Sequence, residues 1–163
     1  MSPPTFRLPT MTNTDTLYAE LKPQMAAVAT PLIDFSKRCL RDPGDFLPHA
    51  AILTAEGKVE LVGAETGREL ANAAEVLPLL HEALRSLARE RSLAALGVAE
   101  SVTITLPGQP STKAIKVLFE HRRGLTASLY VPYEKNPQKG LVFSPMLSML
   151  AEPEVKAFRG IGN

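Results

Sequence analysis

Between residues 102 and 131, apolar side chains recur at every second position along three short segments. Their apolar positions are Val102, Ile104 and Leu106, then Ile115, Val117 and Phe119, then Leu125, Ala127, Leu129 and Val131. Successive side chains of a β-strand point to opposite faces, so this alternation predicts three strands that each bury one face. Residues 107–110 and 122–124 separate the segments, and each linker contains a glycine suited to a tight reversal. We therefore predict an antiparallel meander of three strands.

Two other stretches repeat their apolar residues at steps of three and four, which is the period of a helix with one buried face. The first begins at Thr16 and carries Leu17, Leu21, Met25, Val28, Leu32, Phe35 and Leu40. Pro31, which follows Thr30, either starts a second helix that ends near residue 40 or kinks one longer helix. The other helix follows a cap formed by Asn72 and Glu75 and carries Leu77, Leu80, Leu84 and Leu87.

Shorter segments complete the expected elements. Residues 50–54 and 58–63 flank a turn at residues 55–57 and predict a hairpin. Residues 92–99 fit either a helix end capped by Gly97 or a buried strand, and the apolar run favours the strand. A short strand is possible at residues 141–143, and the chain from residue 152 is expected to be irregular.

This order predicts an α+β fold in which the hairpin and the meander form one antiparallel sheet, with the helices packed on one face. The opposite face is then open and rich in hydroxyl groups: Ser101, Thr103, Thr105, Lys116, Thr126, Ser128 and Tyr130. Residues 1–15 contain three prolines and several Ser and Thr residues, and we expect a disordered tail there. Residues 16–163 are expected to form one domain.

Charge and composition exclude several classes of partner. The 18 Lys and Arg residues nearly balance the 17 Asp and Glu residues, and the formal charge of +1 argues against nucleic acid. The longest apolar runs, such as residues 93–99, are far shorter than the roughly 20 residues that span a membrane. Residues 1–15 do not resemble a secretory signal, and the lone Cys39 forms no internal disulfide. We therefore expect a cytoplasmic protein.

Motifs for known chemistry are missing from the sequence. It contains no nucleophile elbow, no phosphate-binding loop and no dinucleotide-binding turn. His81 and Glu82 begin a zinc-protease signature, but Arg85 stands where the second histidine is needed. With His49 and His121 as the remaining histidines, we predict no metal, no cofactor and no catalytic residue.

Two surfaces are candidate binding sites. Glu120, His121, Arg122 and Arg123 form a turn cluster that can bind an anion or a partner's carboxylate, although a charged loop exposed to water is the stronger explanation. The second candidate is the open sheet face with its aromatic hydroxyls. Its proposed residues are Tyr130, Tyr133, Thr103, Thr105, Thr126 and Ser128.

Three short runs, residues 45–53, 120–124 and 131–133, resemble a pattern found in small uncharacterised bacterial proteins. The resemblance covers about residues 30–160, and it implies a bacterial cytoplasmic protein with a strand near Leu96 and no known activity. The element order also resembles that of the profilin-like group, which includes roadblock and longin domains. That resemblance implies a hairpin beside the last strand of the meander.

We therefore expect a non-enzymatic protein-interaction domain that acts as a homodimer or binds another protein. The alternative is a small-molecule or anion-binding protein, or an enzyme, that uses Glu120, His121 and Arg122 with Tyr133. A third possibility is an immunity protein or an effector chaperone.

Overall fold

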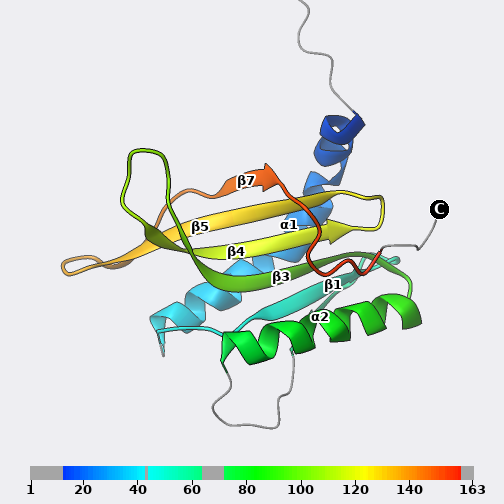
Figure 1. Ribbon diagram of the computed structural model, residues 1–163, viewed down its shortest axis with the longest axis horizontal. Coiled ribbons are helices and arrows are strands. Elements are labelled where there is room, and N and C mark those ends of the chain that lie inside the picture. Colours follow the sequence, from blue (N-terminus) through cyan, green and yellow to red (C-terminus); the bar gives the residue numbers. More distant parts are fainter. Residues whose placement is uncertain (1–12, 43, 64–71, 159–163) are drawn as a thin grey trace, which may run out of the picture.

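In the computed structural model, which describes residues 13–42, 44–63 and 72–158, two helices lie on opposite faces of a seven-stranded antiparallel sheet (Figure 1). In chain order the elements are α1 (Asn13–Arg41), β1 (His49–Thr54), β2 (Val59–Val62), α2 (Ala73–Glu90), β3 (Leu93–Ile104), β4 (Thr112–His121), β5 (Thr126–Asn136), β6 (Gly140–Phe143) and β7 (Leu147–Leu150). The sheet order is β2-β1-β3-β4-β5-β6, and β7 pairs with β5 beside β6. The α+β class, the hairpin and the three-stranded meander are confirmed.

Helix α1 is one helix of 29 residues, so Pro31 does not start a second helix. A proline leaves the carbonyl four residues before it without its helical hydrogen bond. For Pro23 and Pro31 those residues are Ala19 and Ala27, which are both exposed, so water can satisfy the two carbonyls. The helix begins at Asn13, and residues 13–15 of the expected tail are therefore helical; residues 1–12 lie outside the described residues.

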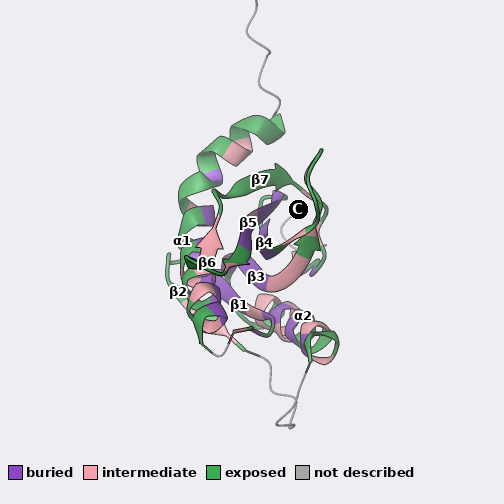
Figure 2. Ribbon diagram, turned by 90° about the vertical axis from the view of Figure 1, so that its left-hand side faces the viewer, coloured by how far each residue is buried: buried purple, intermediate pink, exposed green. Residues whose placement is uncertain are grey.

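The position of the helices differs from the expected one. Alternate residues of the same strands supply two separate cores, one against α1 and one against α2 (Figure 2). In β3, for example, Ala95 and Ala99 lie in the α1-side core while Leu96 and Val98 lie in the α2-side core. Because β3 is apolar at successive positions from Leu93 onward, both of its faces must be shielded from water. Helices on a single face cannot do this.

The hairpin also lies elsewhere than the profilin-like resemblance implies. Strand β1 pairs with β3, the first strand of the meander, through a register that runs from His49 opposite Ala99 to Thr54 opposite Leu93. The far edge of β5 is already occupied by β6 and β7. The strand expected at residues 92–99 is thus confirmed as the first half of β3, at the centre of the sheet.

Local signals in the sequence are also confirmed. Asn72 caps α2, and its Oδ1 accepts a hydrogen bond of 3.0 Å from the Glu75 amide. The short strand expected at residues 141–143 is β6. Within the described ranges, no helix is long and apolar enough to cross a membrane.

Helix α1 packs directly on the backbone of β3 at Gly97. A Cβ atom added at Gly97 would lie 2.5 Å from Cγ1 of Val28 and 3.0 Å from Cδ1 of Leu32. Both leucine and valine side chains are fully buried, so neither can move into open space. Because Gly97 has no side chain, α1 can approach the sheet this closely.

We expect Gly97→Ala to lower the free energy of unfolding by about 1–3 kcal/mol, because it overpacks this contact. Gly63→Ala is the matched control: a Cβ atom there meets nothing within 4 Å, and the expected change is within about 0.5 kcal/mol. Urea unfolding followed by circular dichroism measures both values. Equal stability of the two variants would contradict the close packing of α1 on β3.

Candidate interaction surface

The turn cluster of Glu120, His121, Arg122 and Arg123 is divided by the fold. Glu120 and His121 are consecutive residues of β4, and they therefore point to opposite faces of the sheet. Glu120 lies on the α2 side, and His121 lies on the α1 side against Gln24. The four residues do not form one binding site.

Glu120 fastens the end of the chain to the sheet. Its carboxylate is 3% exposed and accepts backbone hydrogen bonds from Glu154, Val155 and Lys156 at 2.9, 2.7 and 2.9 Å. We call residues 152–158 the C-terminal strap. The strap is irregular, as expected, but Val155 and Ala157 are buried in the α2-side core. Glu120 therefore serves the fold rather than a ligand.

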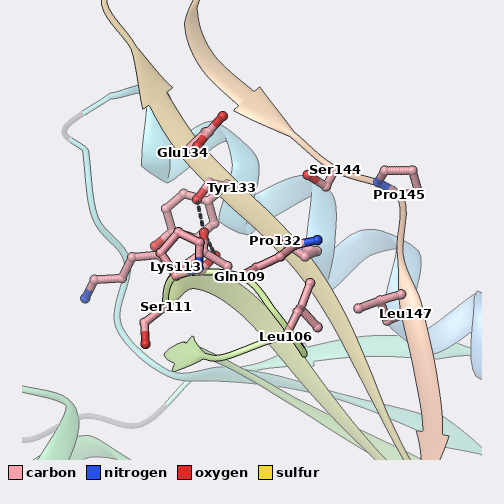
Figure 3. Close-up of a pocket in the computed structure, with 12 residues that line it drawn as sticks. Leu106, Gln109, Ser111, Lys113, Pro132, Tyr133, Glu134, Ser144, Pro145 and Leu147 are labelled. Carbon is pink, nitrogen blue, oxygen red and sulfur yellow. Dashed lines mark hydrogen bonds between the residues drawn. The ribbon is translucent and has the colours of Figure 1, made fainter.

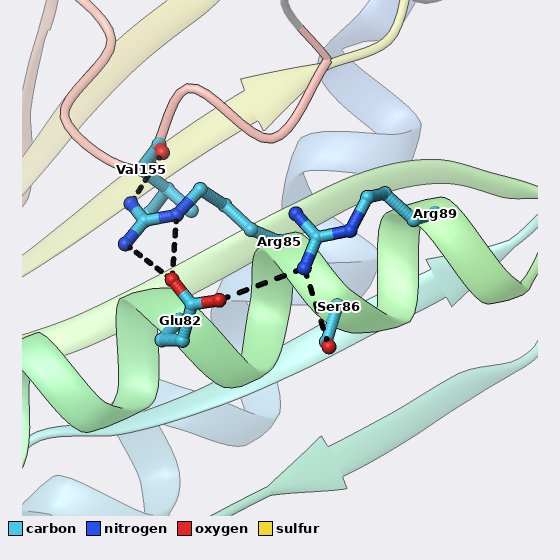
Figure 4. A network of polar contacts seen from close by, with 5 residues as sticks. All are labelled: Glu82, Arg85, Ser86, Arg89 and Val155. Carbon is cyan, nitrogen blue, oxygen red and sulfur yellow. Dashed lines mark hydrogen bonds and ion pairs between the residues drawn. The ribbon is translucent and has the colours of Figure 1, made fainter.

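Two further side chains hold the strap. Lys116 Nζ lies 2.6 Å from a Glu154 oxygen, and Arg85 Nη1 donates a hydrogen bond of 3.0 Å to the Val155 carbonyl (Figure 4). Glu82 orients Arg85 through an ion pair of 3.0 Å. Burial lowers the pKa of Lys116, but the hydrogen bond that Lys116 donates to Glu154, together with the negative charges of Glu154 and Glu100, outweighs burial and the net shift is upward. Arg85 and Glu82 of α2 thus help to hold the strap.

His121 is held by hydrogen bonds on both ring nitrogens. Nε2 lies 2.8 Å from Oε1 of Gln24, and Nδ1 accepts a hydrogen bond of 3.0 Å from the Arg123 amide. The ring is 6% exposed, and its burial, with a smaller contribution from Arg123, lowers its pKa. This geometry fits a neutral imidazole that donates from Nε2. A proton on Nδ1 would face the Arg123 N–H and break that bond.

The two arginines of the cluster are separate as well. Arg123 Nη1 pairs with Glu20 of α1 at 2.7 Å, whereas the Arg122 side chain is exposed and its backbone amide donates to the Ala94 carbonyl. The hollow beside this turn has a volume of about 160 Å³. Pockets that bind small molecules usually measure roughly 300–1,000 Å³.

The expected open hydroxyl face does not exist as one surface. Ser101 pairs with Ile115, so Ser101 and Thr103 lie on the α1 side, while Thr126, Ser128 and Tyr130 lie on the α2 side. The expectation placed Ser101 and Lys116 on the same face, but the register pairs Glu100 with Lys116, so Ser101 lies on the other face. A shift of one residue exchanges the two faces.

Most of the individual hydroxyls are bonded within the chain or have little exposure, whereas Thr103 is exposed. Thr126 and Ser128 are buried, at 8% and 2% exposed. The Tyr133 hydroxyl lies 3.1 Å from the Ser101 hydroxyl, and Thr105, in the loop after β3, is bonded to Ser111 at 2.7 Å. Tyr130 is half-buried.

The most unusual surface of the described residues lies on β7, which the sequence analysis did not predict. Its four residues are all exposed, and with Met146 they form an uncharged apolar strip at the edge of the sheet. We call residues 146–150 the apolar edge. The exposed fractions of its large side chains are 53% for Met146, 37% for Leu147, 52% for Met149 and 48% for Leu150.

A groove opens on each side of the apolar edge. One has a volume of about 660 Å³ and lies between the loop after β3 and the segment that leads into β7, where Leu147 points toward Leu106 (Figure 3). The other measures about 360 Å³ and lies between α1 and β7, with Met25, Leu129 and Met146 in its lining. The apolar edge thus continues into hollows that a partner can fill.

No family model, curated protein or solved structure matches the chain. Among the residues that the structure describes, no group of three or more His, Cys, Asp or Glu side chains is placed to hold a metal ion. Function must therefore be argued from the surface itself.

We expect Glu120→Ala to lower the free energy of unfolding by about 2–4 kcal/mol, because three backbone N–H groups lose a charged acceptor. The amides of residues 154–156 should exchange with solvent much faster, as hydrogen exchange by NMR or mass spectrometry will show. Glu152→Ala, an exposed glutamate of the same strap, is the control and should change neither quantity. Unaltered exchange in Glu120→Ala would show that the carboxylate does not hold the strap.

His121 gives the fold a pH dependence. Its pKa is lower in the folded chain than in the unfolded chain, so the unfolded chain binds more protons as the pH falls below about 6.5. The contribution of neutral His121 to the free energy of unfolding is therefore complete above that pH, and it declines as the pH falls toward the pKa of His121 in the folded chain. We expect His121→Gln to be less stable at pH 8 but to lose less stability between pH 8 and pH 5. Urea unfolding at several pH values tests this, and an unchanged slope would contradict it.

Proposed function

We propose that the chain is a protein-interaction domain that acts as a homodimer, and not an enzyme, in the bacterial cytoplasm. The observation that carries this proposal is the apolar edge. Folded proteins usually protect an edge strand with charges, prolines or a covering segment, because its unpaired backbone recruits other strands. Strand β7 has no charged residue, and its four side chains are exposed.

Burial of this edge provides a driving force for association. Covering the exposed half of a methionine or leucine side chain contributes roughly 1 kcal/mol, and residues 146–150 offer four such side chains. The adjoining grooves extend the surface on both sides of the strand. Uncharged apolar centres of this kind are typical of homodimer interfaces.

The arrangement of the turn supports the interaction domain over the anion-binding alternative. Glu120 and His121 are engaged in internal hydrogen bonds on opposite faces of the sheet. Among the described residues no ion pair of Arg122 is found, and the two hollows that it lines, of about 160 and 240 Å³, are smaller than most ligand pockets. Cys39 is a free thiol, which fits a reducing compartment such as the cytoplasm.

The test is the mass of the native protein as a function of concentration. We expect light scattering after size exclusion to give twice the chain mass of 17.6 kDa at tens of micromolar, with dissociation on dilution. Native mass spectrometry of the same sample reports any retained ligand. A strict monomer at every concentration would refute the homodimer.

A further inference from the structure

We propose that β7 pairs antiparallel with β7 of a second copy of this chain, about a two-fold axis that passes through the sheet at Ser148. The two sheets would then form one continuous sheet. This inference rests on the proposed homodimer and specifies its partner, its surface and its register.

The hydrogen bonds to β5 show which backbone groups of β7 face outward. The Ala151 amide donates to the Thr126 carbonyl at 3.0 Å, and the register continues with Met149 opposite Ser128 and Leu147 opposite Tyr130. In an antiparallel pair, bonded and non-bonded positions alternate, so residues 147, 149 and 151 direct their backbone groups to β5. Residues 146, 148 and 150 therefore direct theirs to the free edge.

A two-fold axis perpendicular to the sheet keeps the α1 sides of both copies on one face of the joined sheet and their α2 sides on the other face. Residue i of one strand must then lie opposite a residue of the same parity in the other copy. With the axis at Ser148, the three outward-facing residues meet one another: Ser148 pairs with Ser148, and Met146 pairs with Leu150 at both ends. Each of these three pairs can form two backbone hydrogen bonds.

The side chains agree best with this register. It places Leu147 opposite Met149 on the α2 side and Met146 opposite Leu150 on the α1 side, so each large apolar side chain meets another. Ser148 lies at the centre, where its hydroxyl oxygen is 2.7 Å from the Tyr18 hydroxyl oxygen of α1 in the same copy. An axis at Met149 would instead set Ser148 against Leu150 and Leu147 against the small Ala151.

Two observations favour a second copy over an unrelated strand as the occupant. Residues 146–150 carry no charge, so the strand can face itself without bringing like charges together. In both views the first turns of α1 rise beyond β7 (Figures 1 and 2). Because the Tyr18 hydroxyl of α1 lies 2.7 Å from the Ser148 hydroxyl, an axis at Ser148 brings the α1 helices of the two copies close to each other on the α1 side.

Cysteine cross-linking tests the register in a Cys39→Ser background. Directly opposed residues of a bonded antiparallel pair have Cα atoms about 5.5 Å apart, within the range of a disulfide. Ser148→Cys should therefore give a covalent dimer on mild oxidation, visible on a non-reducing gel. The Leu150 positions would be roughly 14 Å apart, because they are four residues out of register. Leu150→Cys should stay unlinked alone and cross-link when combined with Met146→Cys.

A charge variant tests the surface independently of the register. Met149→Lys should raise the dissociation constant of the dimer at least tenfold, because it places a lysine in the apolar interface. Leu79→Lys on α2 is the matched control, since Leu79 is 46% exposed and Met149 is 52% exposed. It should leave the dissociation constant unchanged, and circular dichroism verifies that both variants fold.

The outcomes separate the two proposals. A monomeric wild-type chain refutes both of them. A dimer that persists in Met149→Lys and gives no cross-link through Ser148→Cys keeps the homodimer and overturns the β7 pairing. A cross-link through Met149→Cys in place of Ser148→Cys overturns the register. A monomer whose residue 146–150 amides become protected only when another protein is added overturns the second copy as the occupant.

Discussion

Burial of β3 on both faces is the constraint on which the rest of the structure depends. Its consecutive apolar residues must be covered on two sides, so α1 and α2 lie on opposite faces of the sheet. On one side Gly97 lets α1 approach the strand closely through Val28 and Leu32. On the other side α2 is shorter, and part of the cover comes from Val155 and Ala157 of the C-terminal strap. The strap has no helical or strand hydrogen bonds of its own, which is why it needs Glu120 as a common acceptor for three amides.

Most of the elements could be predicted from the sequence, because periodicity and turn residues are local signals. The meander, the hairpin and the Asn72 cap depend only on nearby residues. The register between strands depends on residues that are far apart in the sequence, and it determines which candidate side chains share a face of the sheet. Ser101 and Lys116 were expected on the same face, but Glu100 pairs with Lys116, and this difference of one residue divides the expected hydroxyl face. The residues of the turn cluster are separated for a related reason. Glu120 and His121 are neighbours in sequence, and neighbouring residues of a strand point to opposite faces of the sheet.

The apolar edge could not be found from the sequence because composition does not report exposure. Residues 146–150 are as apolar as many core segments, and their run of side chains fits a buried strand. Only the pairing with β5 shows that β7 is the outermost strand there, and only the structure shows that its side chains stay exposed to water. Similarly, the sequence suggests that Glu120 is an exposed charge, whereas in the structure the C-terminal strap covers it.

The apolar edge differs sharply from the interior of the molecule. Every buried side-chain nitrogen or oxygen among the described residues has a hydrogen-bond partner, and even the irregular strap is tied down by charged groups. The same chain leaves the large apolar side chains of Met146, Leu147, Met149 and Leu150 exposed to water. This exposure is unfavourable in a monomer. Solubility would favour a lysine or glutamate at any of these positions. The absence of charged residues from the apolar edge is explained if a second strand binds to it. That strand would satisfy the free backbone groups and cover the apolar side chains.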